Sequence, residues 1–250
     1  MMTGFRAIRR CRRLTVITLV LALTGCGTLD FASRPFNGAR QAVWLDNAAS
    51  GSRFDEFLVW SDRREIDKAA WSAAGSDTSH AEVSWSNPVT GSSGSVRSGV
   101  VYLVGFNAGV EMQAPVRLDV SVLLEPTAGD YITNANANVR LSPKVDGEKV
   151  TLLRRGNRVK AIAHEPAQGW YLVTSGDRVI GYVFADLLDK ADGGDLLLVG
   201  GDIQYPKLCR ELTYKMAFSS GKSDEWLNGV CREKNRRWSV VGGRSLEAAG

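Results

Sequence analysis

Histidine and cysteine, the residue types that most often build metal centres and nucleophilic sites, are scarce in this chain. Its 250 residues include 2 histidines and 4 cysteines, and neither His80 nor His164 lies near a cysteine in the sequence. A glycine-rich phosphate loop, a zinc-ligand motif and a cysteine block followed by a catalytic histidine are all absent. We therefore expect no catalytic residue, no metal and no cofactor, and we predict that the protein is not an enzyme.

Acidic residues are missing from the first 25 positions, which hold five arginines and a short apolar run from Leu14 to Leu23. That run of ten residues is too short to cross a bilayer, which takes about 20, and no later segment is long and apolar enough. A basic head, a short apolar run and small residues after it are typical of a secretory signal, which we place at residues 1–25.

Removal of that signal changes the charge of the chain. The full sequence has 31 basic and 27 acidic residues, so the loss of five arginines leaves 26 basic residues and a net charge of −1. The sequence pI of 8.9 therefore derives mainly from the signal. A mature chain near neutrality gives no electrostatic reason to expect nucleic acid as a partner.

The signal ends in Leu23-Thr24-Gly25-Cys26. This block resembles the lipobox of bacterial lipoproteins, in which the cysteine sulfur is acylated and the chain is cut just before it. The resemblance implies that Cys26 carries a lipid, of the palmitate type, that anchors the protein to a membrane. Because Gly27 and not an aspartate follows, it also implies an outer-membrane location, with the body in the periplasm or at the cell surface. A plain secretory signal and an uncleaved membrane anchor are the alternatives.

The lipobox resemblance determines how the remaining cysteines are interpreted. Cys11 leaves with the signal and Cys26 carries the lipid, so Cys209 and Cys231 remain. Two thiols in an oxidising envelope compartment most often pair, which predicts a Cys209–Cys231 disulfide. Closing a loop of this size stabilises a fold by about 3 kcal/mol in the chain-entropy model. A metal site and a reactive thiol are the alternatives.

Sequence patterns predict a mainly β chain with one helix. Residues 26–50 read as a tether, and residues 61–74 as a helix with Asp62 and Glu65 as its capping pair and Gly75 as its stop. Alternating apolar and polar residues predict strands. The predicted strands cover residues 81–85, 96–106, 116–124, 211–218 and 237–241, with several short ones over 131–189 and a charged loop between the last two.

Residues 129–189 contain four blocks that resemble the bacterial SH3 (SH3b) domain. The blocks are Asn-Val-Arg with a following Pro in 131–143, a Leu-basic-Gly run in 150–159, Gly-Trp-aromatic in 168–173, and Gly-aromatic-Val in 179–188. The resemblance implies a small SH3-like β-barrel, inserted in or following a second β-rich (α+β) domain. Six of its apolar residues are predicted to form much of the core: Val139, Leu153, Val159, Trp170, Leu172 and Val183.

The same resemblance implies a ligand groove on the predicted barrel. Cell-wall peptide or glycan is the default ligand class, and protein contact is the alternative. Aromatic rings with a few polar groups suit sugars or extended peptides. Five residues are predicted to line the groove: Asn138, Arg140, Trp170, Tyr171 and Tyr182. For Trp170, a place in the core is the alternative to ligand contact.

The segments that flank residues 129–189 resemble the rickettsial-type surface-antigen lipoproteins. The similarity lies in Trp-Ser-Asn-Pro-Val-Thr-Gly at 85–91, in two Cys-Arg-Glu blocks at 209–211 and 231–233, and in Trp238. The glycine zipper of that family is absent, so no membrane-insertion role follows. We expect residues 51–128 and 190–250 to form one surface-antigen-like domain interrupted by the barrel, with separate pieces in series as the alternative.

Residues 207–244 stand out by charge, with nine basic and four acidic residues. Interleaved Tyr214, Trp226 and Trp238 would complete an anion-facing surface, and a solvated loop beside a strand is the alternative. Taken together, the patterns predict a non-enzymatic envelope lipoprotein that binds peptidoglycan or an envelope protein. An adaptor or subunit of an envelope secretion or assembly machine is one alternative, and an unrecognised wall hydrolase is another.

Overall fold

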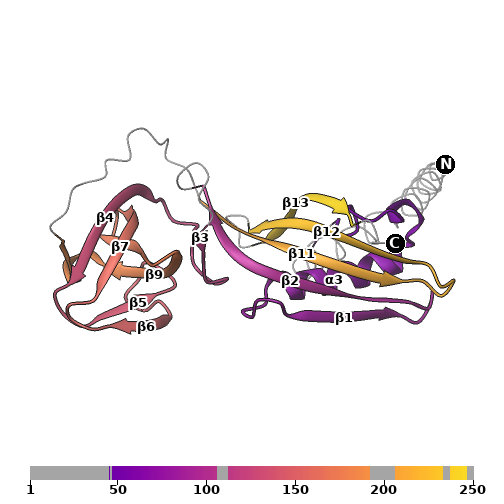
Figure 1. The fold of residues 1–250 in the computed structure, drawn as a ribbon, viewed down its shortest axis with the longest axis horizontal. Coiled ribbons are helices and arrows are strands. Elements are labelled where there is room, and N and C mark those ends of the chain that lie inside the picture. The colour runs from indigo at the N-terminus through magenta and orange to yellow at the C-terminus, as the bar shows by residue number, and fades with distance from the viewer. Residues whose placement is uncertain (1–44, 46, 106–111, 192–205, 233–236, 247–250) are drawn as a thin grey trace, which may run out of the picture. The chain divides into compact units, whose positions relative to one another are not determined.

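The fold is given by a computed structural model, which describes residues 45, 47–105, 112–191, 206–232 and 237–246. The predicted signal, Cys26 and most of the predicted tether lie outside these residues. The described part is mainly β with one α-helix, which confirms the predicted fold class (Figure 1). None of its helices is both long and apolar enough to cross a bilayer.

Strands from both ends of the chain form one antiparallel sheet. β1 (Glu82–Asn87) pairs with β2 (Ser92–Val104), and β2 pairs in turn with β11 (Lys207–Ala217). β12 (Ser223–Arg232) follows as a hairpin partner of β11, and β13 (Trp238–Ser245) closes that side of the sheet. The pairing of β2 with β11 therefore places residues before and after the SH3-like segment in one sheet (Figure 1).

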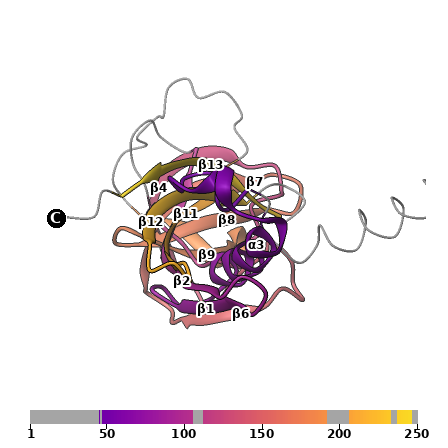
Figure 2. The same cartoon turned by 90° about the vertical axis from the view of Figure 1, so that its right-hand side faces the viewer.

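The single described α-helix, α3 (Trp60–Ala74), packs against β1, β2 and β11 and lies beside them in Figure 2. Its buried face carries Ile66, Ala69, Ala70 and Ala73, as the helical spacing predicts. It ends at Ala74, and Gly75 is its C-cap, also as predicted. A short 3-10 turn, η1 (Asp55–Phe57), precedes it.

The predicted capping pair of the helix is wrong. The N-cap is Val59, which makes no side-chain hydrogen bond to the helix. Asp62 is buried instead, and its carboxylate accepts 2.6 Å hydrogen bonds from the amide of Asn87 and the hydroxyl of Thr90. The carboxylate thus ties the β1–β2 turn to the helix, a long-range role that local spacing does not reveal.

The SH3-like segment is built from short antiparallel strands. β4 (Glu125–Thr133), β7 (Arg158–Glu165), β8 (Trp170–Ser175) and β9 (Arg178–Phe184) pair in that order, with β10 (Leu188–Lys190) beside β4. β5 (Ala137–Arg140) bridges β9 and β6 (Lys149–Leu153). A 3-10 turn, η2 (Ala185–Leu187), links β9 to β10, and β3 (Met112–Gln113) touches β2 and β9.

The sequence predicted a closed β-barrel here, but the sheet of the structure is open. Within the described residues β6 pairs with β5 alone, and no ladder joins it back to β4 or β10. One face of the curved sheet still encloses a small core that includes Val139, Val159 and Val183. The alternating side chains therefore suffice for a core without closure of the hydrogen-bonded ring.

Two further segments differ from their prediction. Residues 116–124 form no strand, because no described strand pairs with them. Val116, Leu118, Val120 and Leu124 are nevertheless buried by packing, whereas Leu123 is 40% exposed. Residues 223–232 form β12, where a charged loop was expected, because alternate positions of the segment face the core. Trp226 and Val230 are buried there, and the buried Asp224 accepts hydrogen bonds from Ser52 and Arg53. The last part of the predicted tether also belongs to the fold, since Leu45, Ala48 and Ala49 are buried in the core.

Candidate functional site

Three aromatic side chains of the SH3-like segment, those of Trp170, Tyr182 and Phe184, lie on one face of β8 and β9. Trp170 is opposite Phe184 and Leu172 is opposite Tyr182, so these four side chains share one face of the two strands. The rings of Trp170 and Phe184 contact edge to face at 5.5 Å. Two of the five predicted groove residues, Trp170 and Tyr182, lie on this face.

The chain itself covers that face. Leu118 and Leu124, in the segment before β4, are fully buried in the same cluster as Trp170 and Tyr182. The Tyr182 hydroxyl donates a 2.5 Å hydrogen bond to the backbone carbonyl of Asp119, and the Asp119 amide donates to the Leu141 carbonyl at 2.7 Å. We call residues 114–124 the covering segment.

Burial beneath the covering segment changes the chemistry of Tyr182. Loss of solvent, and then the nearby negative charge of Asp119, raise the pKa of its hydroxyl above the ordinary tyrosine value. Trp170 is 4% exposed and Tyr182 is 0% exposed. Both rings are therefore buried by the chain itself, and Trp170 has the core position that was the alternative to ligand contact.

The other three predicted groove residues do not converge on one site. Tyr171 lies opposite His164 and Val183, on the face away from Trp170 and Tyr182. Its ring packs 4.9 Å from the ring of Tyr131 on one side and 4.9 Å from that of His164 on the other.

Asn138 and Arg140 lie on β5, and both are half-buried. Asn138 faces Leu152 across the β5–β6 ladder. The Arg140 guanidinium donates a 2.6 Å hydrogen bond to the Gly147 carbonyl and so stabilises the turn that precedes β6. The five residues thus share a domain but form no common groove.

The most exposed apolar surface of the SH3-like segment is on the β5–β6 hairpin. Val145 in the turn is 80% exposed, and Val150 and Leu152 on β6 are 46% and 52% exposed. Val150 and Leu152 are two residues apart in the strand and point to the same side. Exposed aliphatic side chains on an edge strand are typical of a surface that receives another chain.

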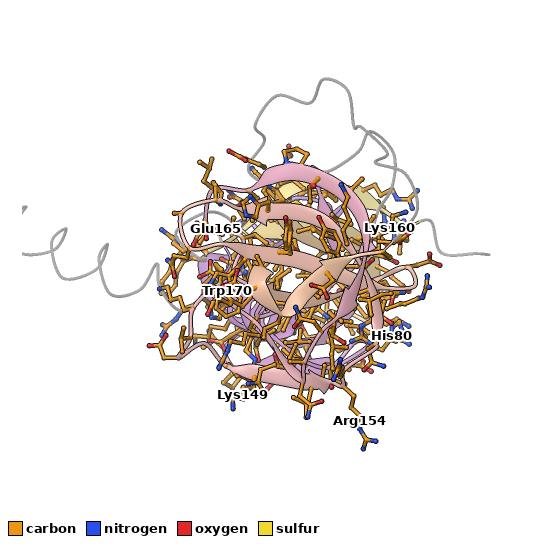
Figure 3. All side chains as sticks on the ribbon, turned by 90° about the vertical axis from the view of Figure 1, so that its left-hand side faces the viewer. His80, Lys149, Arg154, Lys160, Glu165 and Trp170 are labelled. Atoms are coloured by element: carbon orange, nitrogen blue, oxygen red, sulfur yellow. A yellow bond between two sulfur atoms is a disulfide. The ribbon has the colours of Figure 1, made fainter. Side chains whose placement is uncertain are left out.

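Exposed cations lie on β6, directly after it, and at the start of β7. We call β6 with the cations on and after it the basic β6 edge. Its five cations are Lys149, Arg154, Arg155, Arg158 and Lys160. No acidic residue occurs between Lys149 and Lys160, and none of the five forms an ion pair with another described residue. Figure 3 shows the Arg154 side chain extending away from the ribbon.

The basic β6 edge was not among the predicted sites, although a local charge count over residues 149–160 identifies it. The predicted basic surface was at residues 207–244 instead. There the structure buries Tyr214, Trp226 and Trp238, and the first two rings stack at 4.8 Å inside the core. Neither the predicted anion-facing surface nor its alternative, a solvated loop, matches this arrangement.

Two of the arginines in residues 207–244 bind backbone carbonyls. Arg210 is 2% exposed and donates to the carbonyls of Ala74 at 3.0 Å and Ser76 at 2.9 Å, at the end of α3. Burial lowers the pKa of its guanidinium to about 10. Arg232 donates to the carbonyls of Val116 and Leu118 and so holds the covering segment.

The predicted disulfide is present. Cys209 on β11 and Cys231 on β12 lie directly opposite each other and are bonded. The described residues contain no group of three or more side chains suited to hold a metal ion.

Comparison with known proteins supports the identity of one part of the chain. No curated protein matches the sequence. A protein-family model described as the bacterial SH3 domain matches residues 135–189, which span β5 to β10. Residues 135–189 of this chain therefore form a bacterial SH3 domain.

Proposed function

We propose that this protein is a non-enzymatic adaptor of the bacterial cell envelope whose SH3 domain binds another protein. The observation that carries the proposal is the burial of Trp170 and Tyr182 beneath the covering segment. Stacking on a sugar ring requires an exposed aromatic face, and these two rings have none. The exposed groups of the domain are instead aliphatic and cationic, which suits contact with a protein.

Envelope localisation is part of the same proposal. The Cys209–Cys231 disulfide favours an oxidising compartment, and the lipobox-like block at Cys26 favours a lipid anchor in the outer membrane. Because β2 pairs with β11, we also propose that residues 51–128 and 190–250 form one domain into which the SH3 domain is inserted.

A sedimentation assay with purified cell-wall sacculi tests the choice of partner. The mature chain should stay in the supernatant at low salt, where electrostatic contacts are strongest. Retention on sacculi that is lost in a Tyr171→Ala variant would establish wall binding and overturn the proposal. Retention that is lost on charge reversal of Arg154 and Arg155 would assign wall recognition to the basic β6 edge, and would equally overturn it.

Mass spectrometry of the intact protein from membranes tests the localisation. We expect an acylated chain that begins at Cys26, and an unprocessed, unacylated chain for Cys26→Ser. A native protein that keeps Met1 and is recovered without membranes would contradict the envelope assignment.

A further inference from the structure

We infer that the basic β6 edge binds an extended, acidic segment of the partner protein, which adds to the sheet as a strand beside β6. This inference rests on the proposed function, because it names the surface and the partner chemistry of the same SH3 domain. Three observations carry it: a free backbone edge, aliphatic side chains beside that edge, and unpaired cations on β6 and directly after it.

The free backbone edge is the first observation. β6 comprises five residues, Lys149–Leu153, and in the described part of the chain it pairs with β5 alone. Its second row of amide and carbonyl groups therefore lacks a ladder partner. An extended peptide can satisfy such a row with main-chain hydrogen bonds, as in other complexes formed by strand addition.

The aliphatic side chains supply the second observation. Val150 and Leu152 point to one side of the strand and are about half exposed, although most large apolar residues of the SH3 domain are buried. A strand added beside β6 would place its own alternate side chains next to these two. The expected partner segment therefore alternates apolar and polar residues.

Charge supplies the third observation and selects the occupant. Lys160 faces Asp130 across the β4–β7 ladder, but no carboxylate faces the other four cations across a ladder. The nearest acidic residue before β6, Glu148, is engaged by Arg117 at 2.7 Å. A partner strand with glutamate or aspartate at its polar positions would complement Lys149, Arg154 and Arg155.

The same cations argue against a second copy of this chain as the occupant. Pairing of β6 with β6 would bring two sets of cations together, and like charges across a strand pair are destabilising. Charged residues on an edge strand commonly prevent such self-pairing. An acidic partner strand instead places carboxylates beside these cations, so that the two chains attract each other.

Fluorescence anisotropy with a synthetic probe tests the inference on the mature chain. The probe is a labelled nine-residue peptide in which glutamate and valine alternate. One control peptide has its central valine replaced by proline, which lacks an amide hydrogen. Polyglutamate is the control for charge alone. We expect the alternating peptide to bind at least about tenfold more tightly than either control, since only it supplies charge, side chains and a complete backbone edge.

Variants with matched controls locate the binding site. Reversing Arg154 and Arg155 to glutamate should weaken binding at least about tenfold, whereas the same change at exposed Arg97 and Lys222 should alter it less than twofold. Val150→Ser with Leu152→Ser should weaken binding about fivefold, and Val89→Ser with Val241→Ser should not. Amides of β6 should gain protection from hydrogen exchange when the alternating peptide is present.

Each contrary result overturns the inference in a recognisable way. Equal binding of the proline peptide would mean charge attraction without strand addition. Unchanged binding of the Arg154/Arg155 variant would place the binding site elsewhere. If no peptide binds, the only remaining role of the cations is to prevent the pairing of β6 with β6 of a second copy. If the Arg154/Arg155 variant is still retained on sacculi, the proposed function is refuted. The anisotropy and hydrogen-exchange measurements then still decide whether a peptide binds at β6.

Discussion

The hydroxyl of Tyr182 on β9 donates a 2.5 Å hydrogen bond to the backbone carbonyl of Asp119, a residue 63 positions earlier in the chain. This bond joins the SH3 domain to the covering segment. It also explains why an aromatic residue in a ligand-binding family pattern is unavailable to a ligand here. The ring contributes to the core, and its polar tip is satisfied by the chain itself.

Removal of that hydroxyl should cost stability and leave ligand binding unchanged. Tyr182→Phe leaves the buried Asp119 carbonyl without this donor, so we expect the free energy of unfolding to fall by about 1–3 kcal/mol in urea titrations. Tyr171→Phe, a half-buried control on the other face, should change it by less than about 0.5 kcal/mol. Equal stability of the two variants would argue that the Tyr182–Asp119 bond is unimportant.

Alkaline pH should weaken the same contact. Burial raises the pKa of Tyr182 in the folded state, so its stabilising contribution is complete below the pKa of unfolded tyrosine, about 10, and is lost as the pH rises further. As the pH rises from 10 to slightly above 11, the free energy of unfolding of the wild type should therefore fall by about 1.4 kcal/mol more than that of Tyr182→Phe. Parallel stability curves for the two proteins over this range would contradict the assignment.

Arg210 should be essential to the end of α3. Its guanidinium donates to the carbonyls of Ala73, Ala74 and Ser76, and also to that of Gly99 on β2. Arg210→Ala leaves these buried acceptors unpaired, which should lower the free energy of unfolding by about 3 kcal/mol. Hydrogen exchange should also quicken in the last turn of the helix. Arg97→Ala, on the exposed side of β2, should change stability by less than about 0.5 kcal/mol.

The disulfide should stabilise the β11–β12 hairpin even though the two strands already pair. The bond joins residues 22 positions apart, and a loop of this length is worth about 3 kcal/mol in the chain-entropy model. Reductant should lower the melting temperature of wild type and leave that of the Cys209→Ser/Cys231→Ser double variant unchanged. If reductant does not change the melting temperature of the wild type, the disulfide is absent in solution.

Asp62 should hold the β1–β2 turn against α3. Its carboxylate accepts hydrogen bonds from Asn87 and Thr90, so Asp62→Ala should lower the free energy of unfolding by about 2 kcal/mol and expose the turn amides to exchange. Asp77→Ala removes an exposed carboxylate that pairs with Arg117, and it should cost less than about 1 kcal/mol. Similar losses in the two variants would remove the distinction between buried and exposed acceptors.

Alternation of apolar residues alone did not separate a strand from a buried irregular segment. Val116, Leu118 and Val120 alternate as a strand would, yet they lie in the covering segment, where apolar side chains pack without a ladder. The charges of β12 misled in the opposite direction. Glu225 lies on the outer side of the strand, but Asp224 is buried on the same side as Trp226 and Val230, where Ser52 and Arg53 donate to its carboxylate.

Local order along the chain determined the mainly β character, the helix that ends at Ala74, the SH3 domain and the Cys209–Cys231 pair. Periodicity, turn residues and a small number of cysteines are sufficient for these features, because each depends on residues close in sequence or on simple counting. Tertiary structure alone decided which faces remain available. Arg210 and Arg154 are the same residue type, yet the end of α3 covers Arg210 and Arg154 is exposed. Trp170 and Tyr171 are neighbours, yet the covering segment buries only Trp170. Burial depends on what packs against a side chain, and that partner is not specified by the local pattern.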